Sequence, residues 1–454
     1  MALQSLNPAT GENVAHYDEH DGGTVDEMID RAVNAFDLHR ERSFSDRADK
    51  MLHAADLLER RSEEFGRVMT QEMGKPIDQA VAEARKCALV CRYYARHAKE
   101  FLRDEPAGID DVRAFVAFEP LGPILAVMPW NFPFWQVFRF ASPALMAGNV
   151  ALLKHASNVS GCALAIENVL REAGFNQDEF QTLLVSSDRV DGLIADPRIR
   201  AATLTGSVGA GRAVAASAGK AIKPSVMELG GSDPFIVLSD ANMERAVEIG
   251  VTARMQNNGQ SCIAAKRFII EDSAFDEFVP QFVNRIEALR VGDPMDPDTD
   301  VGPVASSGAL EVIHDQVQRA VADDARIRTG GTVLDRPGFF YAPTVLDGVE
   351  PGTVAFEEEI FGPVASVISA RDVDHAVTLA NDTRFGLGGA VFTEDREKGE
   401  RVARQLEVGC AFVNEMVKSD PRLPFGGVKE SGYGRELSRF GIREFVNVKT
   451  IWIA

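Results

Sequence analysis

The chain contains 454 residues, of which 45% are hydrophobic and 26% are charged, and it carries a formal net charge of −20 at pH 7. Its length exceeds that of one typical domain, so the chain can bury two sizeable cores. The acidic balance argues against nucleic acid and membranes as partners, because no basic patch is available to neutralise phosphate groups.

The first residues, Met-Ala-Leu-Gln-Ser-Leu-Asn-Pro, contain neither the basic nor the apolar segment of a signal peptide. The most apolar stretch, residues 123–153, is interrupted by Pro129, Pro133, Arg139 and Pro143. It therefore predicts a buried core and not a membrane span. We expect a cytoplasmic protein.

The cysteines are odd in number and widely spaced, which indicates reduced thiols and no disulfide framework. They are Cys87, Cys91, Cys162, Cys262 and Cys410. Cys87 and Cys91 lie four residues apart, on one face of a predicted helix. A metal pair is an alternative at this spacing. No second ligand pair follows, so we expect two small packed side chains and no metal site.

The N-terminal part of the chain is predicted to be helical over residues 24–104, because apolar residues recur three and four positions apart. This spacing covers residues 28–36 and 51–68, and a further helix is expected over 76–101. A strand-like segment, 113–118, follows an acidic turn.

Short apolar segments then alternate with helical ones, which is typical of βαβ units around a parallel sheet. The first series predicts strands at 124–128, 150–154, 182–185 and 201–205, with helices at 134–148, 159–173 and 208–220. The second predicts strands at 235–238, 267–270, 364–369, 389–392 and 410–414, with helices at 241–257, 274–290, 307–323, 372–382 and 395–407.

The last segment, residues 446–453, is extended and becomes apolar towards its end. A terminal strand of this kind needs a partner. We expect it to pair with the 113–118 segment or across a subunit boundary.

Cys262 follows a small polar run, Asn-Asn-Gly-Gln-Ser, which is expected to expose its thiol at the end of a loop. A thiol is only a few per cent ionised at neutral pH, yet it is the most nucleophilic unactivated side chain. Cys262 is therefore a candidate nucleophile. The alternative is a buried structural cysteine.

Glu228 is followed by two glycines and a predicted buried strand, so the backbone around its carboxylate is unhindered. A carboxylate there can act as a general base towards water. The alternative is an ordinary exposed glutamate in the connection between a strand and a helix.

Asn131 lies between Pro129 and Pro133, in a loop that follows a predicted strand. Open α/β sheets bind ligands at such strand ends. The Asn131 amide can donate a hydrogen bond to a developing oxyanion, or it can form an Asx-turn. Residues 205–211, Thr-Gly-Ser-Val-Gly-Ala-Gly, follow another strand and open a helix, which suits phosphate binding.

These segments occur together in an order and at spacings that resemble the aldehyde dehydrogenase superfamily over essentially the whole chain. The matching residues are Pro129-Trp-Asn-Phe-Pro133, Lys154, Gly206-Ser207 with Gly211, Glu228-Leu-Gly-Gly, Gly259-Gln-Ser-Cys262, Glu358-Glu-Ile-Phe361, Asn414 and Pro424-Phe-Gly-Gly. Longer stretches at 152–156, 228–238 and 264–270 resemble the bacterial-type succinate-semialdehyde dehydrogenase branch, which uses NAD or NADP.

The resemblance implies an α/β fold with a Rossmann-like cofactor domain, an α/β catalytic domain and a small β oligomerisation arm. The expected boundaries are 1–106 and 123–229 for NAD(P) binding, 230–428 for catalysis, and 107–122 with 440–454 for the arm. It also implies a homodimer or homotetramer.

The resemblance further implies a role for each matching residue. Cys262 would attack the aldehyde carbon, the Asn131 amide and the Cys262 backbone N–H would bind the oxyanion, and Glu228 would activate the hydrolytic water. The cofactor would contact Trp130, Lys154, Ser157, Gly206, Ser207, Gly211, Glu359 and Phe361.

Ser157 departs from the family pattern of NAD-preferring members, which carry Glu three residues after the lysine that corresponds to Lys154. The loss of this carboxylate removes repulsion against a 2′-phosphate. We therefore expect that NADP is accepted and that NAD can also be used.

Arg139 lies eight residues after Asn131 in an apolar helix, where succinate-semialdehyde dehydrogenases of the superfamily carry Arg. A guanidinium suits a substrate carboxylate, and Ser419 and Arg422 would add donors. The alternatives are an arginine that extends to solvent or pairs with an acid. Gln256 stands where other such enzymes have a second Arg, so the carboxylate clamp is expected to be built differently.

The predicted reaction is the oxidation of succinate semialdehyde to succinate through a cysteine thiohemiacetal and a thioester. A broad-specificity dehydrogenase for other short aldehydes is an alternative. Glu228 argues against a CoA-acylating enzyme, which typically lacks this base. Cys262 and Asn131 argue against a non-catalytic scaffold.

Overall fold

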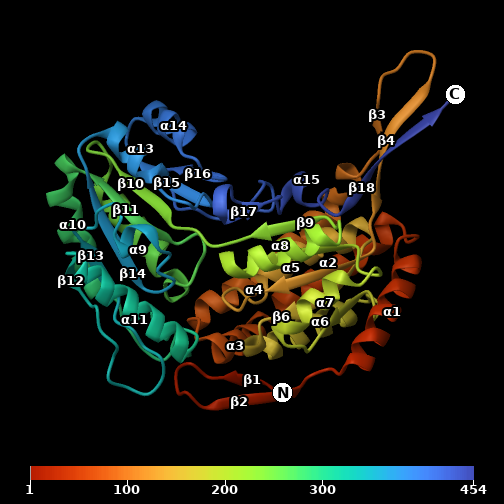
Figure 1. Ribbon diagram of the computed structural model, residues 1–454, viewed down its shortest axis with the longest axis horizontal. Coiled ribbons are helices and arrows are strands. Elements are labelled where there is room, and N and C mark those ends of the chain that lie inside the picture. Colours follow the sequence, from red (N-terminus) through yellow and green to blue (C-terminus); the bar gives the residue numbers. More distant parts are fainter. Residues whose placement is uncertain (1) are drawn as a thin grey trace.

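Two mainly parallel sheets with helices on both faces form the two lobes of the molecule, and a narrow β arm projects from one lobe (Figure 1). The computed structural model describes residues 2–454. The N-terminal hairpin, β1 (Ala2–Leu6) and β2 (Asn13–Asp18), lies along the lower edge of the view in Figure 1.

The first lobe contains a six-stranded sheet in the order β17-β9-β8-β5-β6-β7. All its neighbouring strands are parallel except β17 and β9. Its strands are β5 (Pro123–Met128), β6 (Val150–His155), β7 (Phe180–Thr182), β8 (Ala201–Thr205), β9 (Ser225–Glu228) and β17 (Gly432–Tyr433). Its helices are α1 (Gly22–His39), α2 (Phe44–Arg60), α3 (Ser62–Met73), α4 (Ile77–Phe101), α5 (Trp135–Ala147), α6 (Ser160–Glu172), α7 (Val190–Ala195) and α8 (Val208–Lys220), with short turns η1 (Ser157–Val159) and η2 (Ser187–Arg189).

Successive side chains of strand β5 pack into two different apolar cores, one on each face of the sheet. Ile124, Ala126 and Met128 pack with α2, α4, α5 and α6, whereas Leu125 packs on the opposite face with α1, α7 and α8. Successive side chains of a strand point to opposite faces, so a nearly continuous apolar strand must be covered on both sides. This explains why the sequence places amphipathic helices between its apolar runs.

The second lobe contains a seven-stranded sheet in the order β12-β13-β14-β11-β10-β15-β16. Only the edge strand β12 runs antiparallel to its neighbour. Its strands are β10 (Asp233–Val237), β11 (Ala265–Glu271), β12 (Arg326–Thr329), β13 (Thr344–Asp347), β14 (Val364–Ala370), β15 (Gly388–Phe392) and β16 (Cys410–Val413). Its helices are α9 (Met243–Met255), α10 (Asp272–Glu287), α11 (Ser307–Ala322), α12 (Val354–Glu357), α13 (Val373–Asn381) and α14 (Arg396–Gln405), with the turn η3 (Gln256–Gly259).

The arm is a three-stranded antiparallel sheet of β3 (Glu105–Pro106), β4 (Arg113–Pro120) and β18 (Val446–Ile453). The register of β18 on β4 runs from Val446 opposite Pro120 to Ile453 opposite Arg113. This confirms the expected pairing of the C-terminal strand with the 113–118 segment. The turn η4 (Lys429–Ser431) and helix α15 (Ser438–Gly441) lie in the preceding segment.

The predicted strand at 182–185 is wrong in its bounds, because β7 covers Phe180–Thr182. Leu183 and Val185 follow the strand and pack into the core beside α1 and α7. Their apolar character therefore reflects burial under helices and not strand pairing. Strands β1, β2, β9, β12 and β13 were not anticipated, since each is short or has polar residues at its ends.

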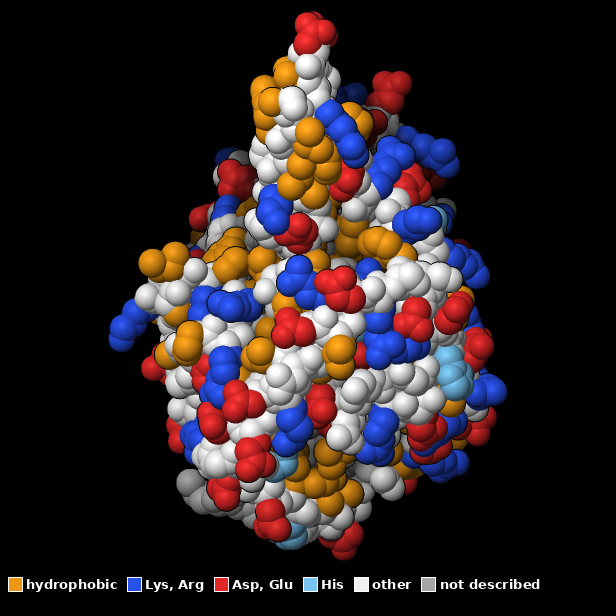
Figure 2. Space-filling view, turned by 90° about the vertical axis from the view of Figure 1, so that its right-hand side faces the viewer, with side chains coloured by type: hydrophobic (Ala, Val, Ile, Leu, Met, Phe, Trp, Pro, Cys, Tyr) orange, Lys and Arg blue, Asp and Glu red, His pale blue; other side chains and the backbone are white. Residues whose placement is uncertain are grey.

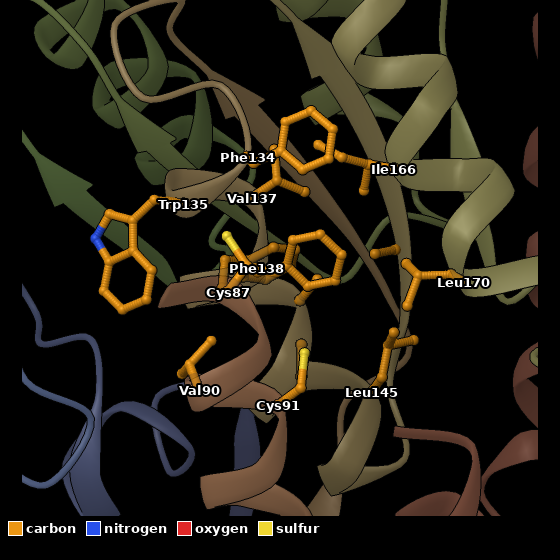
Figure 3. Packing of buried hydrophobic residues seen from close by; sticks show 14 of the residues in the cluster. Cys87, Val90, Cys91, Phe134, Trp135, Val137, Phe138, Leu145, Ile166 and Leu170 are labelled. Carbon is orange, nitrogen blue, oxygen red and sulfur yellow. The ribbon is translucent and has the colours of Figure 1, made fainter. Parts of the chain in front are cut away.

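The Cys87 and Cys91 side chains point into the apolar core between α4 and α5 (Figure 3). Both are fully buried, and the Cys91 thiol lies 3.4 Å from the Ser142 hydroxyl. The structure therefore shows the packing of these two side chains that the sequence predicts. Among residues 2–454, no helix combines the length and apolar character needed to cross a membrane.

The Asn149 side chain connects the turn before β5 to the segment before β18. Its oxygen accepts hydrogen bonds from the backbone N–H groups of Leu121 and Gly122, at 2.8 and 3.1 Å, and its nitrogen donates to the Phe445 carbonyl at 2.9 Å. We expect Asn149→Ala to lower the free energy of unfolding by about 2–4 kcal/mol, because three backbone groups, two of them buried, lose their partner. Urea denaturation measures this change.

The matched control is Asn284→Ala on the exposed face of α10, which should change stability by less than about 0.5 kcal/mol. Equal effects of the two substitutions would contradict the proposed importance of the Asn149 hydrogen bonds.

Candidate active site

The strand order of the first sheet reverses beside β5, with β6 and β7 on one side and β8 and β9 on the other. Ligands bind outside the carboxyl ends of parallel strands at such a point, because the connections there run in opposite directions and leave a crevice. A cavity of about 280 Å³ opens here. It is lined by Pro129, Trp130, Asn131, Gln136, Thr205, Gly206, Ser207, Leu229, Gly230, Cys262, Glu359 and Phe361.

The second lobe supplies Cys262, Glu359 and Phe361 to this cavity, and the first lobe supplies most of the rest. The structure therefore brings together seven of the residues expected from the sequence. The Trp130 and Phe361 rings meet edge to face across the cavity, with centroids 5.8 Å apart.

Cys262 follows a backbone segment with an unusual conformation. Asn257, Asn258 and Gly259 have φ values of 56°, 59° and 74°. The buried Asn258 amide donates to the carbonyls of Gly74 and Pro303, at 2.9 and 2.8 Å. These contacts stabilise a left-handed conformation that asparagine tolerates better than most residues.

Arg254 holds the same loop from inside the second lobe. Its fully buried guanidinium donates to the Gly259 carbonyl at 2.7 Å and also to the Gly362 carbonyl. It therefore joins the segment before Cys262 to the segment after Phe361.

The Asn131 amide is oriented by two neighbours. Its nitrogen donates to the Gln260 carbonyl at 3.1 Å, and its oxygen accepts from the Gln136 side chain at 3.0 Å. A side-chain amide nitrogen has two hydrogens, so a second donor is available to an atom in the cavity. Gln136 was not singled out from the sequence, although its place five residues after Asn131 on α5 is the signal that could have identified it.

Burial raises the pKa of the Cys262 thiol to about 12, while the charges of Arg139 and Lys266 act in the opposite direction. The Lys266 ammonium donates to the carbonyls of Ser261 and Cys262, at 2.9 and 3.0 Å, and lies 3.2 Å from a Glu359 carboxylate oxygen. Lys266 was also missed, although it lies only four residues after the cysteine.

Glu228 ends strand β9 and is only 2% exposed, so the alternative of an exposed glutamate does not apply. Burial raises the pKa of its carboxyl well above the usual value, and the nearby Glu436 carboxylate acts in the same direction. Neither Glu228 carboxyl oxygen has a hydrogen-bond partner among the described residues. This arrangement favours the protonated form and makes the ionised form a strong base.

Arg139 is 2% exposed and forms an ion pair with Glu436, the acid that sequence reasoning missed. It also donates to the Thr205 hydroxyl at 3.2 Å, and its guanidinium lies over the Phe425 ring. The expected role of Arg139 as a donor to the substrate carboxylate stays a prediction. The structure shows the alternative of an arginine paired with an acid, because a charge inside an apolar helix requires a buried partner.

Ser419 and Arg422 were expected to add donors to the substrate, and their side chains lie in different surroundings. The Ser419 side chain is buried and its hydroxyl accepts from Lys86 at 2.8 Å. Arg422 has a side chain that is 78% exposed, and it pairs with Asp420 at 2.7 Å. A nearby acid two residues away thus holds Arg422 at the surface.

The expected cofactor residues lie along the switch point of the first sheet. Ser207 caps α8, and its hydroxyl accepts from the Ala210 N–H at 3.3 Å. Lys154 lies near the carboxyl end of β6, and burial lowers the pKa of its ammonium. Ser157 opens η1 and lines a second cavity of about 440 Å³.

Gly211 packs against the core and does not line the main cavity. A Cβ atom at this position would lie 2.5 Å from the Leu229 side chain, so glycine permits the close approach of α8 to the segment after β9. Gly230 has a related constraint, because a Cβ there would collide with the Glu359 carboxylate.

The chain belongs to the aldehyde dehydrogenase family, whose model matches residues 1–451. It is similar to a probable succinate-semialdehyde dehydrogenase [NADP(+)] of Synechocystis sp., with 52% identity over 454 residues and 100% of each chain covered. It is also similar to succinate-semialdehyde dehydrogenase [NADP(+)] 1 of Mycobacterium tuberculosis, with 54% identity over 457 residues and 100% of each chain covered.

A solved structure of succinic semialdehyde dehydrogenase from Streptococcus pyogenes, in complex with NADP+, has a TM-score of 0.98 to this chain at 36% identity. The match covers 100% of both chains. These comparisons confirm the predicted fold class and the predicted class of enzyme.

The raised pKa of Cys262 predicts a specific pH dependence for its alkylation by iodoacetamide. Below its pKa the thiolate fraction rises about tenfold for each pH unit. We therefore expect alkylation of Cys262 in the free protein to rise steadily from pH 7 to pH 9. Mass spectrometry of the Cys262 peptide measures the rate. A plateau below pH 8 would contradict the effect of burial.

Proposed function

We propose that this chain oxidises succinate semialdehyde to succinate, with NAD or NADP as the cofactor. The observation that carries this proposal is the convergence of the Cys262 thiol and the oriented Asn131 amide on one cavity, with the Glu228 carboxyl buried nearby. The names of the relatives at 52% and 54% identity support the substrate.

In the proposed first step, the Cys262 thiolate attacks the aldehyde carbon and forms a thiohemiacetal. The Asn131 amide and the Cys262 backbone N–H donate hydrogen bonds to the oxygen, which becomes negatively charged. The Gln136 and Gln260 contacts fix the Asn131 amide beforehand, so little reorganisation is needed during the reaction.

Cys262 would keep the acyl group as a thioester once a hydride leaves the thiohemiacetal, and bound NAD(P) would supply the hydride acceptor. Ionised Glu228 then accepts a proton from the water that attacks this thioester. A carboxyl with a raised pKa is suited to this role, because a base works best when its pKa approaches the working pH. Hydrolysis releases the acid and restores the thiol.

The groups that line the cavity suit the binding of a dinucleotide. The N-terminus of α8 presents backbone N–H groups beside Gly206 and Ser207, which suits a pyrophosphate. Phe361 and Glu359 border the same cavity, near Cys262, where they would position the nicotinamide ribose and ring. Lys154 and Ser157 would contact the adenosine ribose.

The proposed assembly is a homodimer or homotetramer in which the arm is part of the interface. Val448, Trp452 and Ile453 of β18 are 62%, 56% and 46% exposed. Figure 2 shows apolar side chains on the projecting arm. An edge strand with exposed apolar residues is a surface that oligomers commonly cover.

Glu228→Gln should separate acylation from hydrolysis. We expect steady-state turnover to fall about 10²–10⁴-fold, because the general base is lost. The first equivalent of NADPH should still form, since hydride transfer precedes the step that needs Glu228. Stopped-flow absorbance at 340 nm measures the burst. If both the burst and turnover disappear in a folded variant, Glu228 has a different role.

Ser157→Glu should shift the cofactor preference towards NAD. A carboxylate beside the ribose would repel a 2′-phosphate, so we expect kcat/KM for NADP to fall about 10–100-fold, with little change for NAD. Ser157→Gln is the matched control, because it adds similar bulk without charge. An equal loss in both variants would point to steric exclusion and would contradict the electrostatic argument.

A further inference from the structure

Lys266 connects the segment that carries the reactive thiol to a carboxylate that lines the same cavity. It lies near the start of strand β11 and is only 3% exposed. Its ammonium donates to the backbone carbonyls of Ser261, Cys262 and Ala264, at 2.9, 3.0 and 3.4 Å. It also lies 3.2 Å from Glu359 Oε1, and among the described residues Glu359 is the only acid within 4.0 Å of it. A buried charge depends on such partners, because the interior solvates it poorly.

The two carboxylate oxygens of Glu359 have different surroundings. Oε1 accepts a hydrogen bond from the Gly231 N–H at 3.2 Å, in addition to its ion pair with Lys266. Oε2 accepts no hydrogen bond from residues 2–454. It lies beside Gly230, where a Cβ atom would collide with it, and both Gly230 and Glu359 line the cavity that contains Cys262. Oε1 is therefore occupied by the chain, whereas the lone pairs of Oε2 are left for a bound molecule.

Two further groups lie near the Lys266 ammonium. The centroid of the Phe361 ring, which lines the cavity, is 6.0 Å away. The buried Asp233 carboxylate is more than 4.0 Å away and accepts from the Gly388 N–H at 3.1 Å. Lys266 is therefore paired with the acid that lines the cavity and not with Asp233.

This arrangement relates the positions of two groups that the proposed reaction uses in the same step. The Cys262 sulfur would carry the carbon that gives up the hydride, and Glu359 would hold the nicotinamide ribose. Lys266 contacts the backbone of the first and the side chain of the second. Hydride transfer needs aligned atoms in close contact, and a displacement of about 1 Å can cost about 10²-fold in rate.

We propose that Lys266 is a positioning residue for hydride transfer. It holds Glu359 Oε1, so that Oε2 accepts the hydroxyl groups of the nicotinamide ribose at a fixed distance from Cys262. This inference rests on the proposed function, and within it on the cofactor role of Glu359. Lys266 itself touches neither substrate nor cofactor, so its effect should depend on the presence of the Glu359 carboxylate.

The first test measures the burst of NADPH with succinate semialdehyde and saturating NADP, by stopped-flow absorbance at 340 nm. Lys266→Met should slow the burst about 10–100-fold, because Glu359 is no longer held in place. Glu359→Gln should slow it to a similar extent. The double variant should be no more than about threefold slower than either single variant, since two residues that act as one unit are not additive.

The second test measures binding without turnover, by calorimetric titration. NADP should bind about 3–10-fold more weakly to Lys266→Met than to the wild type, since the Glu359 contact is weakened. Adenosine 2′,5′-bisphosphate, which lacks the nicotinamide ribose, should bind equally to both.

Two control variants accompany both tests. Lys266→Arg keeps the charge and should recover most of the burst and of the NADP affinity. Lys398→Met removes a partly exposed ion pair with Asp240 in the same lobe and should leave both unchanged. If Lys266→Met does not fold, Lys266→Gln carries the same tests, because its amide can still donate to the backbone carbonyls without a charge.

The outcomes separate this inference from the proposed function. An unchanged burst in Lys266→Met, beside a slow burst in Glu359→Gln, would overturn only the role of Lys266. Losses that multiply in the double variant would also overturn it, because Lys266 would then act on Cys262 independently of Glu359. Equal weakening of NADP and adenosine 2′,5′-bisphosphate would do the same, since it would indicate a general structural role.

Two further outcomes concern the proposed function itself. A normal burst in Glu359→Gln would overturn the cofactor role of Glu359, and this inference with it. A wild type that gives no burst with succinate semialdehyde would overturn the proposed substrate, whereas the two titrations would still decide the role of Lys266.

Discussion

The position of the Cys262 thiol depends on buried hydrogen bonds to the left-handed segment before it. Asn257, Asn258 and Gly259 adopt positive φ values, which are costly for residues other than glycine unless the surroundings hold them. Asn258 binds the backbone of two distant segments, and Arg254 binds the carbonyl of Gly259. The thiol therefore reaches its place only when both lobes are packed around this loop.

Both burial and ion pairing determine the protonation of the charged side chains near the thiol. Arg139 and Glu436 form a buried ion pair. Glu228 lies beside them without a hydrogen-bond partner among the described residues, and burial raises the pKa of its carboxyl. On another side, the Lys86 ammonium has only neutral partners at close range.

The sequence predicted the helices and strands that have a strong periodic pattern, but it did not predict the short strands correctly. Strand β8 and helix α8 match the predicted residues 201–205 and 208–220, because an apolar run is followed directly by a capped helix. The strand expected at 182–185 was displaced, since apolar composition cannot distinguish residues in a strand from residues packed under a helix. Strand β9 was missed because it is short and ends in a glutamate.

The sequence by itself determined the family, the alternation of strands and helices, and the candidate roles of Cys262, Asn131 and Glu228, because these depend on local patterns and on motif order. Only the tertiary structure decided how the charges pair. Arg139 forms an ion pair with Glu436, 297 residues away in the sequence, and Lys86 donates a hydrogen bond to Ser419, 333 residues away. Such contacts are set by packing between distant segments, and no local pattern in the chain encodes them.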